Sequence, residues 1–396
     1  MAEIGATPGG GVERLALTSE DKRARDFLVT RLNEMGLDVT IDEMGNIFGT
    51  RRGSDDSSSP VMTGSHADTQ PRGGRFDGIL GVVAGLEVLQ TLADRGIETR
   101  RPVTLVVWTN EEGSRFPPAM MASGVWAGRL ELERAWRTAD VDGAVFGDEL
   151  ERIGYKGSAP CASWPFHSYF ELHIEQGPML ERTGRLIGVP KGILSLNWYD
   201  IYVDGQADHA GTTPMDARHD ALVAAAEMIL KVRELPAKLG GDTVATVGEL
   251  HNRPNSRNVI PEAVRFSVDI RTWDDGLAQR SWEDLEADVT AIAARHGCLV
   301  RAESTGHAEH SEFAPHLVER VRTVAESLGF DTLPMVSGAV HDAGCVATAG
   351  PAAMIFVPSV GGRSHVEVEE TSWDDCEAGA NVLLHCVLRS ANEVTP

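Results

Sequence analysis

The chain has 396 residues, of which 42% are hydrophobic, so it is long enough for two or three domains or for one large domain with an insertion. It carries 36 Lys and Arg residues against 59 Asp and Glu residues, a formal net charge of −23. A surface this acidic repels phosphate backbones and anionic lipid headgroups, which argues against nucleic acids and membranes as partners.

The first part of the chain predicts helices that alternate with buried strands. Residues 17–35 and 82–92 place apolar side chains at helical spacing. Continuous apolar runs predict strands that are covered on both faces, at 103–109, 169–174 and 353–358. A shorter apolar run before the segment GSHADT predicts one more strand. Strands alternating with helices predict an open, mixed α/β sheet.

The middle of the chain has a different pattern, in which strand residues alternate between apolar and polar. In chain order we expect a strand at 199–203, a helix at 222–232, strands at 242–250 and 264–270, a helix at 282–292 and a strand at 298–304. The order β-α-β-β-α-β is the ferredoxin-like α+β pattern. We therefore predict a domain at 195–308, inserted into a large domain made of 1–194 and 309–396, where a helix at 315–328 resumes the first pattern.

The cysteines and the N-terminus indicate a reducing compartment. The five cysteines are odd in number, widely spaced and without a CxxC pair, which is typical of free thiols. The N-terminus lacks the apolar core of a secretory signal, and no stretch approaches the roughly 20 apolar residues of a membrane span. We expect a cytoplasmic protein without a membrane partner.

Histidines and acidic residues stand at the ends of the strands predicted for the large domain. They are His66 and Asp68 after the first strand, Asp77 at the start of the next helix, Glu111 and Glu112 after the second strand, His173 near the end of the third, and His365 after the fourth. Ligands of an open α/β sheet bind at the carboxyl ends of its strands, so these side chains are expected to converge.

Each of these residues alone also has a simple structural explanation. A single histidine at a strand end is usually a polar loop residue, adjacent glutamates are usually solvated, and Asp77 could cap its helix. The Glu111–Glu112 pair, however, follows a run that is too apolar for the surface. Imidazole nitrogens and carboxylate oxygens together suit borderline metal ions, and two ions about 3.5–4 Å apart need a bridging carboxylate.

Motifs along most of the chain resemble those of the metal-dependent hydantoinase/carbamoylase amidases, which belong to the aminoacylase-like dinuclear metallopeptidases. They are GSHADT, GGRFDGILGV, NEEGSRFP, HIEQGPMLE, DHAGTTPM, NVIP with DIR, SGAVHDA and MIFVPSVGGRSH. HIEQGP and NEEGSRF are specific to this branch. The family includes N-carbamoyl-L-amino-acid hydrolases, allantoate and ureidoglycolate amidohydrolases, and β-ureidopropionases.

The resemblance implies a centre with two divalent metal ions, Zn²⁺ or Mn²⁺, with Co²⁺ and Ni²⁺ as alternatives. The implied ligands are His66, Asp77, Glu112, His173 and His365, with Asp77 as the bridge. Glu111 is then the general base that deprotonates the attacking water, and Asp68 fixes the tautomer of His66. The metals polarise the carbonyl group of the substrate and make hydroxide available near neutral pH.

The same resemblance makes the inserted domain a lid and dimerisation domain of a homodimer. It implies that His209 enters the neighbouring subunit's active site and stabilises the tetrahedral oxyanion. Asn258 and Arg271 are implied to clamp a substrate carboxylate, and Gln176 and His341 to add polar contacts. The plain alternatives are a loop-capping role for His209 and a strand-end salt bridge for Arg271.

Departures from the family pattern concern the substrate. Val340 stands where glycine is usual, Arg363 stands where a small or apolar residue is usual, and SHVEVE replaces SHSPxE with Glu369 in the last position. We expect an amidohydrolase for a small carboxylate substrate, first of all an N-carbamoyl-L-amino acid. The alternatives are an allantoate or ureidoglycolate amidohydrolase, an N-acyl amino acid hydrolase or dipeptidase, and a catalytically silent dimeric binding protein.

Overall fold

The computed structural model describes residues 1–393, and the chain divides into two compact units. The large unit combines Met1–Gly192 with Glu312–Pro396, and the small unit is the intervening segment Ile193–Ser311. The insertion expected from the sequence was 195–308.

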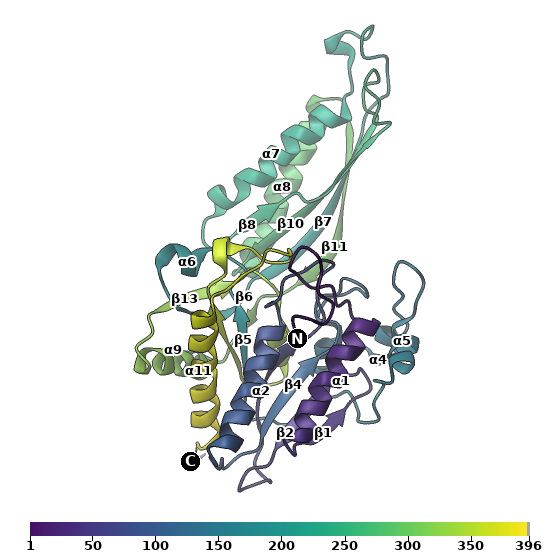
Figure 1. The fold of residues 1–396 in the computed structure, drawn as a ribbon. Coiled ribbons are helices and arrows are strands. Elements are labelled where there is room, and N and C mark those ends of the chain that lie inside the picture. The colour runs from purple at the N-terminus through teal and green to yellow at the C-terminus, as the bar shows by residue number, and fades with distance from the viewer. Residues whose placement is uncertain (394–396) are drawn as a thin grey trace. The chain divides into compact units, whose positions relative to one another are not determined.

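A nine-stranded mixed sheet forms the core of the large unit, with the order β1-β2-β4-β3-β5-β14-β6-β12 and with β13 paired to β6 (Figure 1). Its central strands are β3 (Val61–His66), β4 (Val103–Trp108), β5 (Ser168–Ile174) and β14 (Ala352–Val357). These four strands are mutually parallel, and every residue in them is buried. The predicted open α/β sheet is confirmed.

The outer strands of this sheet were not predicted. They are β1 (Asp38–Ile41), β2 (Ile47–Arg51), β6 (Ile187–Ile193), β12 (Ser311–Glu312) and β13 (Thr332–Ser337). Two of them contain proline, and the others are short or partly exposed, so they lack the apolar runs that identify the central strands. Antiparallel pairing of β1 with β2 and of β2 with β4 makes the sheet mixed.

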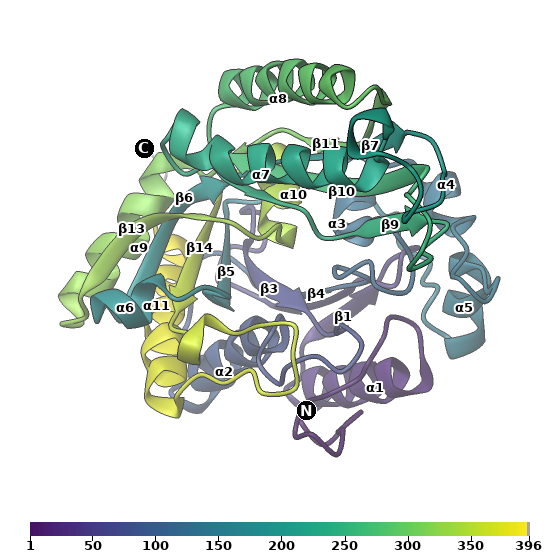
Figure 2. The ribbon, with the colours of Figure 1, turned by 90° about the horizontal axis from the view of Figure 1, so that it is seen from above.

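Four long helices belong to the large unit. They are α1 (Ser19–Glu34), α2 (Ile79–Asp94), α9 (Pro315–Ser327) and α11 (Trp373–Ala391). The first three were predicted, whereas α11 was not. Figures 1 and 2 show α2 and α11 side by side. Helix α2 lies close against the sheet at Gly81, where an added Cβ would lie 2.4 Å from the Leu172 carbonyl oxygen. Only a residue without a side chain allows this close approach.

Shorter helices fill the connections of the large unit. They are α3 (Met121–Trp126), α4 (Leu132–Trp136), α5 (Phe146–Ile153), α6 (Met179–Thr183) and α10 (Asp342–Ala349). The cysteines of the chain are all free and buried. Within the described residues, no helix has the length and apolar character needed to cross a membrane.

The small unit is a five-stranded antiparallel sheet with the order β11-β7-β10-β8 and with β9 paired to β10. Its elements are β7 (Ser195–Asp204), α7 (Ala221–Leu239), β8 (Val244–Thr246), β9 (Leu250–Arg253), β10 (Ala263–Thr272), α8 (Asp275–Arg295) and β11 (Leu299–Ala308). Helices α7 and α8 lie side by side (Figures 1 and 2). The ferredoxin-like order is confirmed, with one correction. A single strand was expected at 242–250, but the structure has two short strands there, β8 and β9. Gly248 lies between them, and a glycine inside a strand weakens it.

Candidate active site

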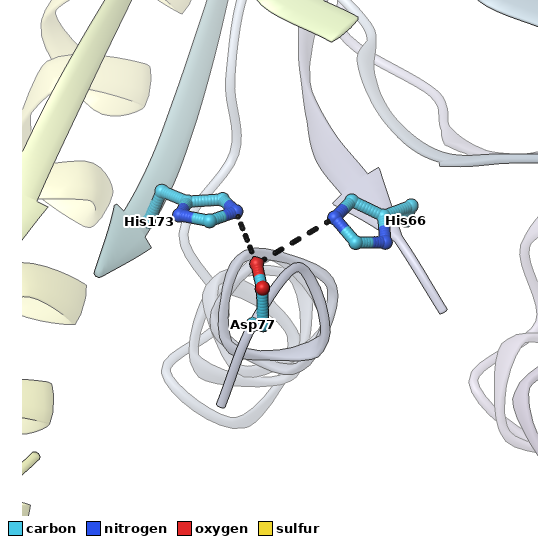
Figure 3. A group of neighbouring side chains, drawn as sticks. All are labelled: His66, Asp77 and His173. Atoms are coloured by element: carbon cyan, nitrogen blue, oxygen red, sulfur yellow. Dashed lines mark ion pairs between the residues drawn. The ribbon is translucent and has the colours of Figure 1, made fainter. Parts of the chain in front are cut away.

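Asp77, at the entry to α2, is the centre of the site. Its Oδ1 lies 3.2 Å from His173 Nε2 and 3.9 Å from His66 Nε2. Figure 3 shows both imidazole rings directed at this carboxylate from β5 and β3. Its Oδ2 lies 3.2 Å from His365 Nε2. The two oxygens of one buried carboxylate therefore face two different sets of side chains, which is the arrangement of a bridging ligand.

Two groups of side chains that share Asp77 could each hold a metal ion. One contains His66, Asp77 and His173, and the other contains Asp77, Glu112 and His365. Within each group, one ligand atom per residue lies within 4.8 Å of the others. The five residues come from the ends of β3 and β5, the entry to α2, and the segments after β4 and β14. The structure thus brings together the side chains that were expected to converge at the strand ends.

The donor set fits divalent metal ions. It consists of imidazole nitrogens and carboxylate oxygens, which suit borderline metals. In residues 1–393, the ion pairs of Asp77, Glu111 and Glu112 involve only histidines and no lysine or arginine. Burial, together with Asp77, raises the pKa of Glu112 to about 8. A cluster of buried carboxylates without a basic side chain is stabilised by cations.

Main-chain carbonyl groups set the tautomers of two of the histidines. His66 Nδ1 lies 2.9 Å from the carbonyl oxygen of Asp68, and His173 Nδ1 lies 2.9 Å from that of Ile174. A carbonyl oxygen only accepts, so both Nδ1 atoms carry a proton, and in the neutral form of each ring the Nε2 atom presents its lone pair toward Asp77.

Asp68 reaches His66 through its main chain rather than through its side chain. Its carboxylate lies 3.9 Å from His66 Nδ1, beyond hydrogen-bond distance, and the main chain of Asp68 makes that contact instead. The carboxylate accepts hydrogen bonds from the main-chain N–H groups of Glu111 and Glu112, both at 3.2 Å. Asp68 thus holds the turn that carries the glutamate pair.

The two adjacent glutamates point to different partners. Glu111 Oε2 lies 3.5 Å from His66 Nε2, and Glu111 belongs to neither candidate metal group. Glu112 Oε2 lies 3.6 Å from His365 Nε2 and accepts a hydrogen bond from Gln70 Nε2 at 2.7 Å. Burial, with the nearby charge of Asp342, raises the pKa of Glu111 well above its ordinary value. One glutamate can bind a metal while the other remains available for proton transfer.

Gln176 and His341, predicted as substrate contacts, both lie at the site. Gln176 Nε2 donates to Asp77 Oδ2 at 3.1 Å, and its Oε1 is buried without a partner among the described residues. His341 is buried, with its ring 4.5 Å from that of His173 and its Nε2 3.0 Å from Ser337 Oγ. Val340 is half-buried and is not among the described residues with positive φ, so it replaces glycine without backbone strain.

Two buried glutamates support the candidate ligands and were not recognised in these roles from the sequence. Glu369 Oε1 accepts the main-chain N–H of Asp77 at 3.0 Å. Glu171 accepts hydrogen bonds from the hydroxyl groups of Ser65 and Tyr169, at 2.7 and 3.0 Å. Burial lowers the pKa of His173, but Asp77 and then Glu171 outweigh it and raise this pKa to about 9. The signal for Glu171 was its position two residues before His173 on one strand, which places both side chains on one face.

The other predicted site residues belong to the small unit. His209 and Asn258 are exposed and lie on adjacent segments, because Ala210 N donates to the Asn258 carbonyl oxygen at 2.9 Å. Arg271, on β10, donates from Nε and Nη2 to the Asp269 carboxylate at 3.1 and 2.8 Å. The salt bridge weighed as the plain alternative for Arg271 is therefore present.

Comparisons with known proteins identify the family. Residues 62–389 match the model of peptidase family M20/M25/M40. The chain is 44% identical to an N-carbamoyl-L-amino-acid amidohydrolase of Rhizobium meliloti, over 100% of this chain and 95% of that protein. It is 38% identical to an enzyme of the same name from Geobacillus stearothermophilus, over 99% and 96%. The crystal structure of a hydantoinase/carbamoylase family amidase from Burkholderia multivorans matches with a TM-score of 0.96 and 49% identity, over 100% of this chain and 96% of that one. This chain therefore belongs to the M20 peptidase family and, within it, to the hydantoinase/carbamoylase amidases, which are hydrolases of non-peptide C–N bonds.

Proposed function

We propose that the chain is a two-metal amidohydrolase that converts an N-carbamoyl-L-amino acid into the amino acid, CO₂ and ammonia. The observation that carries this proposal is the pair of candidate metal groups that share Asp77, with Glu111 beside them and outside both. The names of the similar proteins from Rhizobium meliloti and Geobacillus stearothermophilus support the choice of the carbamoyl group.

The chain's own residues divide the work. His66 and His173 would hold one ion and Glu112 and His365 the other, with Asp77 available to both. Ions bound there would polarise the carbonyl group and make hydroxide available near neutral pH. Zn²⁺, Mn²⁺, Co²⁺ and Ni²⁺ all suit this donor set.

Glu111 acts as the general base and then as the general acid. Its carboxylate takes the proton of the attacking water and delivers it to the amino-acid nitrogen as the C–N bond to the carbamoyl carbon breaks. The carbamic acid that is released decomposes to CO₂ and ammonia. The Nε2 atom of Gln176 donates to Asp77, and its Oε1 atom has no partner among the described residues. In this proposal, Oε1 accepts a hydrogen bond from an N–H group of the ureido substrate.

The small unit supplies the substrate clamp and the dimer contact in this proposal. Arg271 and Asn258 bind the substrate carboxylate, and His209 stabilises the oxyanion in the active site of the neighbouring subunit. The salt bridge with Asp269 is compatible with a clamp, because it fixes the direction of the guanidinium group of Arg271.

Arg271→Met is expected to raise KM for the free acid about tenfold or more, since a charge-assisted hydrogen bond contributes about 1.5–3 kcal/mol. The wild-type protein should have a higher KM for the amidated substrate than for the free acid, and this difference should disappear in Arg271→Met. Arg265→Met is the matched control, because Arg265 lies on the same strand and donates to Asp200 at 2.8 Å in the same way. Equal hydrolysis of acid and amide by the wild-type protein would make Arg271 a structural residue.

A mixed dimer tests whether His209 acts on the neighbouring subunit. Glu111→Gln and His209→Ala subunits should each be inactive alone, and their purified heterodimer should regain about half of the wild-type activity, because one of its two sites is intact. The control heterodimer combines Glu111→Gln with Glu112→Gln, which leaves each chain with a damaged centre. A heterodimer with His209→Ala that stays as inactive as this control would show that His209 does not act in trans.

Ammonia and amine release from a substrate panel tests the proposed reaction. The panel contains N-carbamoyl, N-formyl and N-acetyl L-amino acids, allantoate and ureidoglycolate. N-carbamoyl derivatives of acidic amino acids are included because Arg363 is exposed and stands two residues before His365. Cleavage of N-carbamoyl-L-amino acids above all others is the expected result. Cleavage of allantoate or an N-acyl amino acid without any N-carbamoyl compound would contradict it.

A further inference from the structure

The chain before α1 lies against the two segments that carry the candidate ligands His66 and His365. We call residues 4–14 the N-terminal strap. Figures 1 and 2 show the purple strap beside the yellow segment that precedes α11. None of the candidate metal ligands lies in the strap. Its contacts can therefore affect the metal site only by fixing the position of the two segments that carry His66 and His365.

On one side, the strap is bonded to the segment between His66 and Asp77. Val12 N donates to the Gly73 carbonyl oxygen at 3.0 Å. Arg14 N donates to Thr69 Oγ1 at 2.8 Å, and Thr69 N donates back to the Arg14 carbonyl oxygen at 3.0 Å. This segment is therefore fixed at two places between its two ligands.

Arg14 adds a buried anchor to this side. Its side chain is only 1% exposed, and its Nε donates to the Ala67 carbonyl oxygen at 2.7 Å, directly after His66. Its Nη1 donates to the Ile4 carbonyl oxygen at 2.8 Å, so one guanidinium group joins the strap to the ligand segment. Burying a cation costs free energy, which the hydrogen bonds of the guanidinium group offset. The N–H donors of this planar group have fixed directions, so the bonds to Ala67 and Ile4 fix the relative position of the two segments.

On its other side, the strap contacts the segment that follows His365. Thr7 Oγ1 donates to Glu367 Oε1 at 2.5 Å. At Gly11, an added Cβ would lie 2.3 Å from the Gly73 carbonyl oxygen and 2.7 Å from Glu367 Cα. Only a glycine fits there, because the strap passes between the two segments at that point.

We infer that the N-terminal strap is a positioning element for the metal site. It holds the His66–Asp77 segment and the His365–Glu369 segment close together, so that both candidate metal groups share Asp77. The inference rests on the proposed function. Without the strap, metal binding has to order two loops, and the entropy cost of that ordering lowers the affinity for the ions.

Two variants of the strap test this inference in the full-length protein. Gly11→Ala forces the strap away from both segments. Arg14→Lys keeps the positive charge but loses the paired hydrogen bonds of the guanidinium group to Ala67 and Ile4. The matched controls are Gly248→Ala, where an added Cβ lies 3.8 Å from Ser267 Oγ, and Arg320→Lys, which loses a fork bound to Glu393 and Ser390. Each protein is stripped with a chelator and titrated with Zn²⁺ in competition with a chromogenic chelator. The thermal unfolding of each metal-free protein is recorded in parallel.

We expect both strap variants to bind Zn²⁺ about 10–100-fold more weakly than the wild-type and control proteins, as is typical when the support of metal ligands is removed. An unchanged Zn²⁺ dissociation constant in folded variants would overturn the inference, even if their metal-free forms unfold at a lower temperature. If Gly11→Ala does not fold, Thr7→Val removes the hydrogen bond to Glu367 and gives the same readout. A wild-type protein that binds no Zn²⁺ would contradict the proposed function rather than the role of the strap.

Discussion

Glu111→Gln is expected to lower kcat at least about 10²-fold while the protein keeps its metal ions. The glutamine side chain has the same shape but cannot accept a proton from water, and Glu111 belongs to neither candidate metal group. The measurement is kcat for the best substrate of the panel, together with the metal content of the same preparation.

The neighbouring residue gives the comparison for this prediction. Glu112→Gln should lose metal, because Glu112 lies in the group with Asp77 and His365. The opposite pattern, with metal lost from the Glu111 variant and kept in the Glu112 variant, would reverse the assignment of base and ligand. A wild-type kcat in Glu111→Gln would remove the general base from the mechanism.

Asp77→Asn is expected to remove both ions and to lower activity about 10³-fold or more, because metal ions contribute several kcal/mol to transition-state stabilisation. One oxygen of Asp77 faces His66 and His173, and the other faces His365. An asparagine offers one carbonyl oxygen, and its NH₂ group turns a donor toward the remaining ligands. The metal content per chain, measured after gel filtration, checks this result.

Asp42→Asn is the matched control for Asp77→Asn. Asp42 is also a buried carboxylate, in the turn between β1 and β2, where it accepts the main-chain N–H groups of Met44 and Asn46 at 2.9 Å. This substitution tests the loss of a buried charge away from the site, and we expect both ions to remain. Loss of a single ion from Asp77→Asn would show that Asp77 is a ligand in one group only.

The sequence predicted the elements whose residues carry a strong pattern. β4 and β14 are recognisable because strands covered on both faces are continuously apolar, and β10 because its burial alternates residue by residue. β6 and β13 contain proline and lie at the side of the sheet, so nothing in their sequences distinguishes them from loops.

The convergence of the candidate ligands was predictable for a related reason, because parallel strands bring their carboxyl ends to one edge of the sheet. The supporting contacts were not predictable. The bond of Glu369 to the Asp77 N–H joins segments far apart in the sequence, and the choice between the carboxylate and the main chain of Asp68 depends on atomic positions. The N-terminal strap has no helical or strand periodicity, so its role emerges only from its contacts with the ligand segments.

We expect hydrolysis of an N-carbamoyl-L-amino acid to require two metal ions held around Asp77. The most direct test is to strip the protein with a chelator, restore Zn²⁺ or Mn²⁺ stepwise, and measure bound metal and ammonia release in the same samples. We expect no activity in the stripped protein and full recovery as the bound metal reaches two ions per chain. Full activity in a metal-free preparation would rule out a two-metal mechanism.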